Sequence, residues 1–185
     1  YWRRADPSAK TRARAATPFG QDRETPPFSA SDLAALEEAG VGWLSEPIHL
    51  LVPDASSRRR CKRTKLHVCS HRLPERSFVK LSRHVMVASP ELTCLSIAPS
   101  TPFPLLVEFL YELCGRYRLP DGRGGDATEL PPATTVAGIE RFADKARGVR
   151  GAADVKRALR YACDNSLSPM ETDIAETMVF DPRMG

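Results

Sequence analysis

Apolar residues recur at helical spacing in several stretches of the chain and form a continuous run in a few short ones. A Ser-x-x-Asp capping pair, an apolar face and a terminal Gly40 predict a helix from about residue 29 to 40. The run at 48–52, between two prolines, is typical of a buried strand. We therefore expect His49 inside this strand to be a core residue and not a ligand.

The same patterns predict three more strands and several more helices. Strands are expected near residue 66 and near residues 78 and 85, the last two as a hairpin that turns at 82–84. Ser89, Thr135 and Ser168 have the side chains of helix N-caps. Helices are predicted to begin near residues 90, 102, 136, 152 and 169, the fourth ending at about Cys163. The predicted fold class is α+β, with a small mixed sheet of about four strands covered by several helices.

Composition divides the chain into four parts. Residues 1–27 are rich in Arg, Ala, Thr and Pro, which predicts a disordered basic tail. Residues 28–119 form the expected α+β domain, and residues 120–133 a linker rich in glycine and proline. Residues 134–185 form the expected helical segment, which leads into a nuclease-like domain whose core we expect to be missing from this chain.

Charge and cysteine content narrow the class of partner and the compartment. The chain has 185 residues, 42% hydrophobic content and a net charge of +4, an excess that suits an acidic partner such as nucleic acid. Five cysteines, an odd number without a Cys-x-x-Cys pair, predict reduced thiols and a cytoplasmic protein. No apolar run is long enough to span a bilayer, so no membrane partner is expected.

Two groups of cations are the candidate phosphate contacts. One lies between the first two predicted strands and the other on the polar side of the helix at 152–163. Cations placed this closely repel one another and stay in solvent unless an anion neutralises them. Either group can equally be an ordinary solvated surface. The candidate residues are Arg58, Arg59, Arg60, Lys62, Arg63, Lys65, Lys156, Arg157 and Arg160.

Potential metal ligands alternate along the second predicted strand. His67, Cys69 and His71 would face one way, with Cys61 nearby. Their spacing matches no common zinc motif, and a straight strand spreads alternate side chains too far apart to share one ion easily. We therefore predict no metal site and no cofactor for this chain.

Residues 168–172 form a Ser-Pro-Met-Glu-Thr motif that has two interpretations. Ser168 and Glu171 make a capping box, which needs no further partner. The motif also resembles the first motif of the very-short-patch-repair-like domains in the PD-(D/E)xK nuclease superfamily. That resemblance implies that Glu171 is one acidic residue of a catalytic Mg²⁺ site in a complete nuclease form. The other acids and the lysine would lie on strands beyond this chain.

Residues 47–172 as a whole are similar to the AbiEi-type antitoxin-related family, whose C-terminal part is very-short-patch-repair-like. The resemblance implies a bacterial, DNA-binding antitoxin or a nuclease-fold protein. The chain departs from the family in two places. The family usually has a glycine in the turn where residues 82–84 stand here. The family also commonly has an N-terminal winged helix, of which residues 29–40 would be the only remnant in this chain. The similarity rests on Pro47-Ile-His-Leu-Leu-Val-Pro, His67-Val68, Phe78-Val-Lys-Leu, Val85-Met-Val-Ala-Ser-Pro-Glu, Leu105-Leu-Val-Glu, Tyr111-Glu-Leu-Cys-Gly, Tyr117-Arg-Leu-Pro, Arg157-Ala-Leu-Arg-Tyr and Ser168-Pro-Met-Glu-Thr.

The expected function is that of a DNA-associated antitoxin or defence-related regulator, truncated before its nuclease-like core. One alternative is the N-terminal part of a metal-dependent DNA endonuclease with Glu171 as a ligand. Another is a protein-interaction module whose basic patches meet a cognate toxin or another acidic partner. Enzyme activity is not expected from this chain as given.

Overall fold

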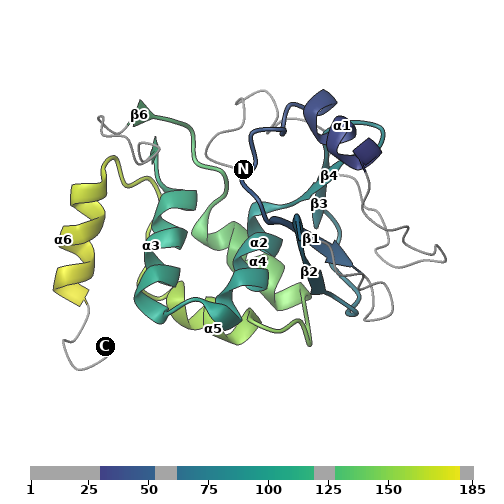
Figure 1. Cartoon of the computed structure of the whole chain (residues 1–185). Coiled ribbons are helices and arrows are strands. Elements are labelled where there is room, and N and C mark those ends of the chain that lie inside the picture. The colour runs from purple at the N-terminus through teal and green to yellow at the C-terminus, as the bar shows by residue number, and fades with distance from the viewer. Residues whose placement is uncertain (1–29, 53–61, 119–127, 180–185) are drawn as a thin grey trace. The chain divides into compact units, whose positions relative to one another are not determined.

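The computed structural model describes residues 30–52, 62–118 and 128–179 (Figure 1). The predicted tail at 1–27, Arg58 to Arg60 and most of the linker at 120–133 lie outside these residues. The chain divides into two compact units between Val87 and Ala88. This division falls inside the predicted domain at 28–119, at the end of the predicted hairpin.

The first unit contains one helix and four strands within its described residues. Its elements are α1 (Ala30–Glu38), β1 (Ile48–Val52), β2 (Thr64–Val68), β3 (Phe78–Lys80) and β4 (Met86–Ala88). All five coincide with elements that the apolar pattern predicts.

Strands β1 and β2 pair in parallel, from Ile48 opposite Thr64 to Val52 opposite Val68. Ile48 and Val52 are buried, as predicted for this strand. The expectation that His49 is a core residue is wrong, because its side chain is exposed. Successive side chains of a strand point to opposite faces, so His49 lies on the face opposite to Ile48 and Val52.

Strands β3 and β4 form the predicted hairpin. The Leu81 N–H donates to the Val85 carbonyl at 2.9 Å, and the Ser82 hydroxyl accepts from the Val85 N–H at 3.2 Å, which closes the turn. The described strands pair only in twos, however, as β1–β2, β3–β4 and β5–β6. The α+β class is confirmed, whereas the single four-stranded sheet is wrong for the described residues. Strands as short as the three residues of β3 and of β4 offer few backbone groups to a further strand.

The second unit is mainly helical. Its elements are α2 (Pro90–Ile97), η2 (Ala98–Ser100), α3 (Phe103–Cys114), β5 (Tyr117–Arg118), β6 (Thr128–Glu129), α4 (Val136–Lys145), α5 (Ala152–Ala158) and α6 (Pro169–Val179). Figure 1 shows α2 to α5 gathered into one bundle, in which α2 contacts α3, α4 and α5.

The core of this unit is apolar and fully enclosed. Helix α3 contributes Leu106, Leu110 and Leu113, each at most 1% exposed. Full burial of such side chains stabilises a fold by about 1.5–3 kcal/mol each. The remaining fully buried large side chains include Leu92, Leu95, Val107, Ile139 and Val155.

Local signals set the helix boundaries. The Ser89 hydroxyl accepts from the Leu92 N–H, and the Thr135 hydroxyl accepts from the Gly138 N–H, so both predicted N-caps are confirmed. Helix α5 ends at Ala158, five residues before the predicted Cys163. Past that point the Tyr161 N–H donates to the Ala158 carbonyl, an i to i−3 bond that replaces the α-helical ladder with a turn.

Candidate nucleic-acid interface

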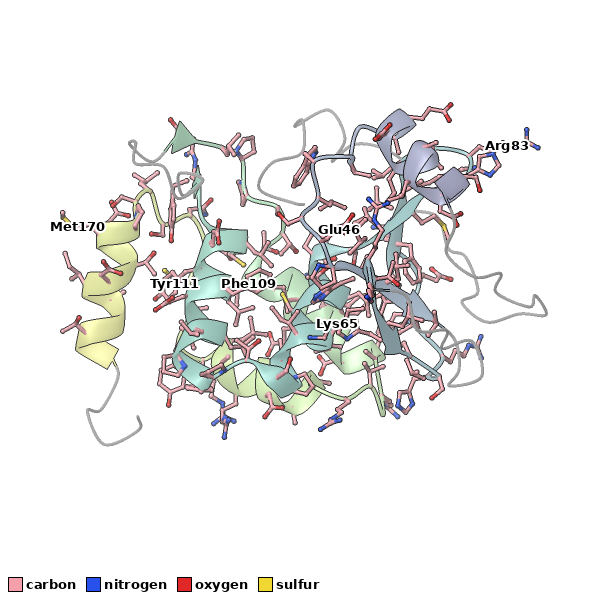
Figure 2. All side chains as sticks on the ribbon, viewed as in Figure 1. Glu46, Lys65, Arg83, Phe109, Tyr111 and Met170 are labelled. Carbon is pink, nitrogen blue, oxygen red and sulfur yellow. The ribbon has the colours of Figure 1, made fainter. Side chains whose placement is uncertain are left out.

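The first predicted cluster of phosphate contacts lies only in part within the described residues. Arg58 to Arg60 fall outside them. Lys62 and Lys65 are exposed, Lys65 on strand β2 (Figure 2). The Arg63 guanidinium already has an anionic partner, because its Nη2 and Nε lie 2.5 and 2.6 Å from Glu46 Oε1. Two of the three described cations therefore remain for an external anion at this place.

The predicted cations of the later helix are engaged by neighbours within the second unit. Lys156 forms an ion pair with Asp144 of α4. The Arg157 guanidinium stacks 4.7 Å from the centre of the Phe103 ring, with its Nη2 3.8 Å from Asp154 Oδ1. These contacts orient both side chains on the surface. All of these charged groups are close to half exposed, so the pairs are weak and can open toward another anion.

Four further cations that the sequence prediction omitted lie beside them. Arg141 and Lys145 are four residues apart on α4, which places them on one side of the helix. Arg147 and Arg150 lie in the short connection from α4 to α5. With Arg160, all are exposed, and none forms an ion pair in the part of the chain that the structure describes. We call Arg141, Lys145, Arg147, Arg150, Lys156, Arg157 and Arg160 the hairpin cations.

Apolar packing holds the α4–α5 hairpin in place. Helices α4 and α5 pack against each other and each contacts α2. Ile139 and Ala143 of α4 and Val155 and Ala158 of α5 are at most 3% exposed. Because a helix repeats every 3.6 residues, burial of positions 139 and 143 leaves Arg141 and Lys145 on the solvent side.

A glycine fixes the connection between these helices. Gly151 has a φ of 93°, and a Cβ at this position would lie 2.2 Å from the Leu95 carbonyl oxygen of α2. Only glycine fits both the backbone conformation and the close approach. The connection that carries Arg147 and Arg150 is thus anchored to the core of the unit.

A sequence signal for this surface exists in the local charge balance. Residues 140–160 contain seven Lys or Arg and three Asp or Glu, a net charge of +4 that equals the net charge of the whole chain. The rest of the chain is therefore neutral overall. The sequence prediction did not include Arg141, Lys145, Arg147 and Arg150. It considered the charges of each helix by itself and not the combined charge of α4, α5 and their connection.

Glu171 occupies the capping position that the sequence predicts. The Ser168 hydroxyl accepts from the Glu171 N–H at 3.2 Å, and Glu171 Oε2 accepts from the Leu167 N–H at 2.8 Å. Both bonds satisfy N–H groups at the start of α6, as in a capping box, although the carboxylate reaches one residue further back than the usual partner. The described geometry therefore gives Glu171 a structural role.

Two thiols of the second unit, those of Cys94 and Cys114, are buried. Burial raises the pKa of the Cys94 thiol well above its usual range, and it raises the pKa of Cys114 to about 12 with help from the nearby Asp164 carboxylate. All four cysteines within the described ranges are free. Within these ranges no three His, Cys, Asp or Glu side chains converge.

Asp164 has a further structural role at the start of α4. Its Oδ1 accepts from the Val136 N–H at 2.8 Å, next to the N-cap residue Thr135. The segment before α6 thus reaches back to the first turn of α4. This bond helps to set the direction of the helix that carries Arg141 and Lys145.

None of the described helices combines the length and the apolar character needed to cross a bilayer. Comparison with protein-family models, curated proteins and solved structures finds no match to this chain.

Proposed function

We propose that the chain is a DNA-associated protein that holds the phosphates of a duplex on its hairpin cations, in a regulatory and not a catalytic role. The observation that carries this proposal is the surface of α4, α5 and their connection. There, five exposed cations have no ion pair among the described residues.

Electrostatics supports an extended polyanion as the ligand. Like charges on one rigid hairpin repel one another, and an anion that spans several of them relieves that repulsion. Duplex DNA presents its charges at regular short intervals, and each neutralised phosphate releases a condensed counterion. Because backbone contacts carry no sequence information, the expected binding is strong at low salt and largely independent of sequence.

The resemblance to AbiEi-type antitoxin-related proteins supports the regulatory part of the proposal. Under this proposal Lys62, in the turn before β2, and Lys65, on β2, contribute a second set of phosphate contacts in the first unit. An endonuclease role for a longer form of the protein would require Glu171 to leave its cap and join further ligands around Mg²⁺.

The deciding experiment measures the affinity of the full chain for a fluorescent duplex of mixed sequence over a range of salt concentrations. If the hairpin cations bind phosphates, the logarithm of the affinity should fall linearly with the logarithm of salt. The contribution of the hairpin cations to this slope should approach about −4.5 if all five of them without an ion pair take part. Arg147→Ala with Arg150→Ala should reduce that slope by about 2 and weaken binding at every sequence.

The matched control is Arg83→Ala, since Arg83 is an exposed cation on the β3–β4 turn of the first unit (Figure 2). It should leave the slope almost unchanged. An equal loss in this control would mean that net charge, and not the hairpin surface, governs binding. Absence of salt-dependent duplex binding by the unaltered chain would refute the proposed function.

A protein-interaction role is the second candidate, and one observation favours it. Met170 is 71% exposed on α6 (Figure 2). Ile174, four residues further along the helix, is 51% exposed, and Leu167 before the helix is 56% exposed. Apolar side chains grouped in this way suit a protein partner. Absence of salt-dependent duplex binding would favour this candidate, and Met170→Ser should then weaken binding of the chain to its protein partner.

A further inference from the structure

Two histidines from neighbouring strands meet on the outer face of the β1–β2 pair. His49 Nδ1 lies 3.2 Å from His67 Nε2, and the ring centres are 4.9 Å apart. The parallel register places Lys65 opposite His49 and His67 opposite Leu51, so the two imidazoles are diagonal neighbours on one face. His49 is exposed and His67 is half-buried, so solvent reaches the pair.

We propose that His49 and His67 form a two-histidine site for a divalent transition-metal ion of the zinc type. The distance between the facing nitrogens carries the proposal. Two imidazole nitrogens that bind one tetrahedral zinc ion, each at about 2.0–2.1 Å, lie about 3.3–3.4 Å apart. The observed separation of 3.2 Å is therefore already close to the span that a shared ion requires.

The rings need only a small rotation to convert the hydrogen bond into a metal site. In the hydrogen bond one nitrogen directs its hydrogen at the lone pair of the other, whereas in a tetrahedral complex each lone pair turns by about 35° toward the ion. His49 is exposed, so its ring can turn without displacing core side chains.

The proton balance of binding is simple. One of the facing nitrogens carries the hydrogen of the present bond. Metal binding requires lone pairs on both, so that hydrogen leaves to solvent and the same ring takes a proton on its other nitrogen. No net proton is released from two neutral rings, and protons compete with the metal at low pH.

The surroundings predict the kind of ion and the strength of binding. Neutral imidazoles suit zinc, copper and nickel, whereas Mg²⁺ prefers oxygen ligands. Since the described residues contain no converging group of three potential ligands, water would fill the other coordination positions. The Lys65 ammonium lies on the same face and opposes a bound cation, so the affinity should rise when that charge is removed.

The test titrates the full chain with Zn²⁺ in a thiol-free reductant, with calorimetry and the ring proton resonances of the histidines as readouts. The unaltered chain should bind one ion with perturbation of the His49 and His67 resonances, and Mg²⁺ should have no effect. Even the loss of a side chain that only hydrogen-bonds a metal ligand weakens metal binding roughly 10–100-fold. Removal of a ligand itself should cost at least as much, so His49→Ala and His67→Ala should each weaken zinc binding at least about tenfold. Lys65→Gln should strengthen it.

Two control variants keep the assignment falsifiable. His84→Ala removes an exposed imidazole from the β3–β4 turn, and Cys69→Ser removes the half-buried thiol that follows β2. Both should retain the affinity of the unaltered chain. A loss in either control that equals the loss in His49→Ala, or zinc binding that survives His49→Ala and His67→Ala, would overturn the two-histidine site.

Discussion

The hydroxyl oxygen of Tyr117 lies 3.0 Å from Oγ1 of Thr172, across 55 residues of sequence. The Ser166 hydroxyl lies 3.1 Å from the same Thr172 oxygen. Tyr117, Ser166 and Thr172 are between 3% and 6% exposed, so their hydroxyls satisfy one another in the protein interior. This buried hydroxyl cluster connects strand β5 to the first turn of α6.

Thr172→Val should destabilise the protein by about 1–3 kcal/mol. The substitution keeps the shape of the side chain but removes the oxygen that both Tyr117 and Ser166 contact, which leaves buried polar groups without this partner. Urea unfolding followed by circular dichroism measures the change. The neighbouring Thr177→Val is the control, because Thr177 is exposed and bonds only the Asp173 carbonyl. Similar losses in the two variants would contradict a role for the cluster.

Glu171→Ala should lower the free energy of unfolding by about 1 kcal/mol without changing any metal response of this chain. The carboxylate caps the start of α6 through the Leu167 N–H, and losing such a cap typically costs about 0.5–2 kcal/mol. Asp173→Ala, on the exposed side of the same helix, should change the unfolding free energy by less than about 0.5 kcal/mol. Mg²⁺-dependent nicking of duplex by the unaltered chain, abolished in Glu171→Ala, would instead identify Glu171 as a catalytic ligand.

Sequence reasoning succeeded where short segments determine the structure. Ser89, Thr135 and Ser168 lie three residues before the N–H groups that they accept from, so their capping roles follow from neighbouring residues alone. The strands at Ile48–Val52 and Thr64–Val68 were likewise predicted from local apolar runs. Their parallel pairing was not, because the register depends on a connection whose path the sequence does not specify.

The misses share one physical cause, which is that they depend on contacts between distant residues. His49 was expected in the core, but the side of β1 that faces inward is set by packing against the rest of the unit. Its contact with His67 depends on the register of the two strands. The ion pair of Lys156 with Asp144 requires α4 and α5 to lie side by side. Periodicity within one helix contains no information about such a pair.

Protein stability should fall as the pH rises above 9. Burial raises the pKa of the Cys114 thiol from 9.0 to about 12, so between these values the folded protein keeps a proton that the unfolded chain has lost. Because the folded state then binds more protons, unfolding becomes more favourable with rising pH. The contribution of Cys114 is intact below pH 9.0 and is lost progressively between there and about pH 12. Urea unfolding at several pH values from 8 to 11 measures the slope.

Cys114→Ala should make this dependence shallower, although it lowers stability at every pH by removing a buried atom. Comparison of slopes, and not of absolute stabilities, separates the two effects. Cys163→Ala is the comparison variant, because Cys163 is exposed and is the smallest of the causes that raise the pKa of Cys114, so it should change the slope much less. An unchanged slope in Cys114→Ala would show that other groups cause the alkaline loss of stability.

Asp144→Asn should strengthen duplex binding by up to about fivefold at low salt. The ion pair with Asp144 engages Lys156, and exposed pairs of this kind are worth about 1 kcal/mol or less, which sets the upper limit of the gain. The released ammonium would join Arg160, which lies four residues further along the chain. The gain should shrink as salt rises toward physiological strength, where screening weakens exposed charges. Fluorescence anisotropy with the duplex at two salt concentrations measures both effects.

Glu75→Gln removes an exposed negative charge from the first unit and is the matched control. An equal gain in the control would attribute the effect to net charge. A gain confined to Asp144→Asn would place the phosphates on the hairpin cations beside Lys156.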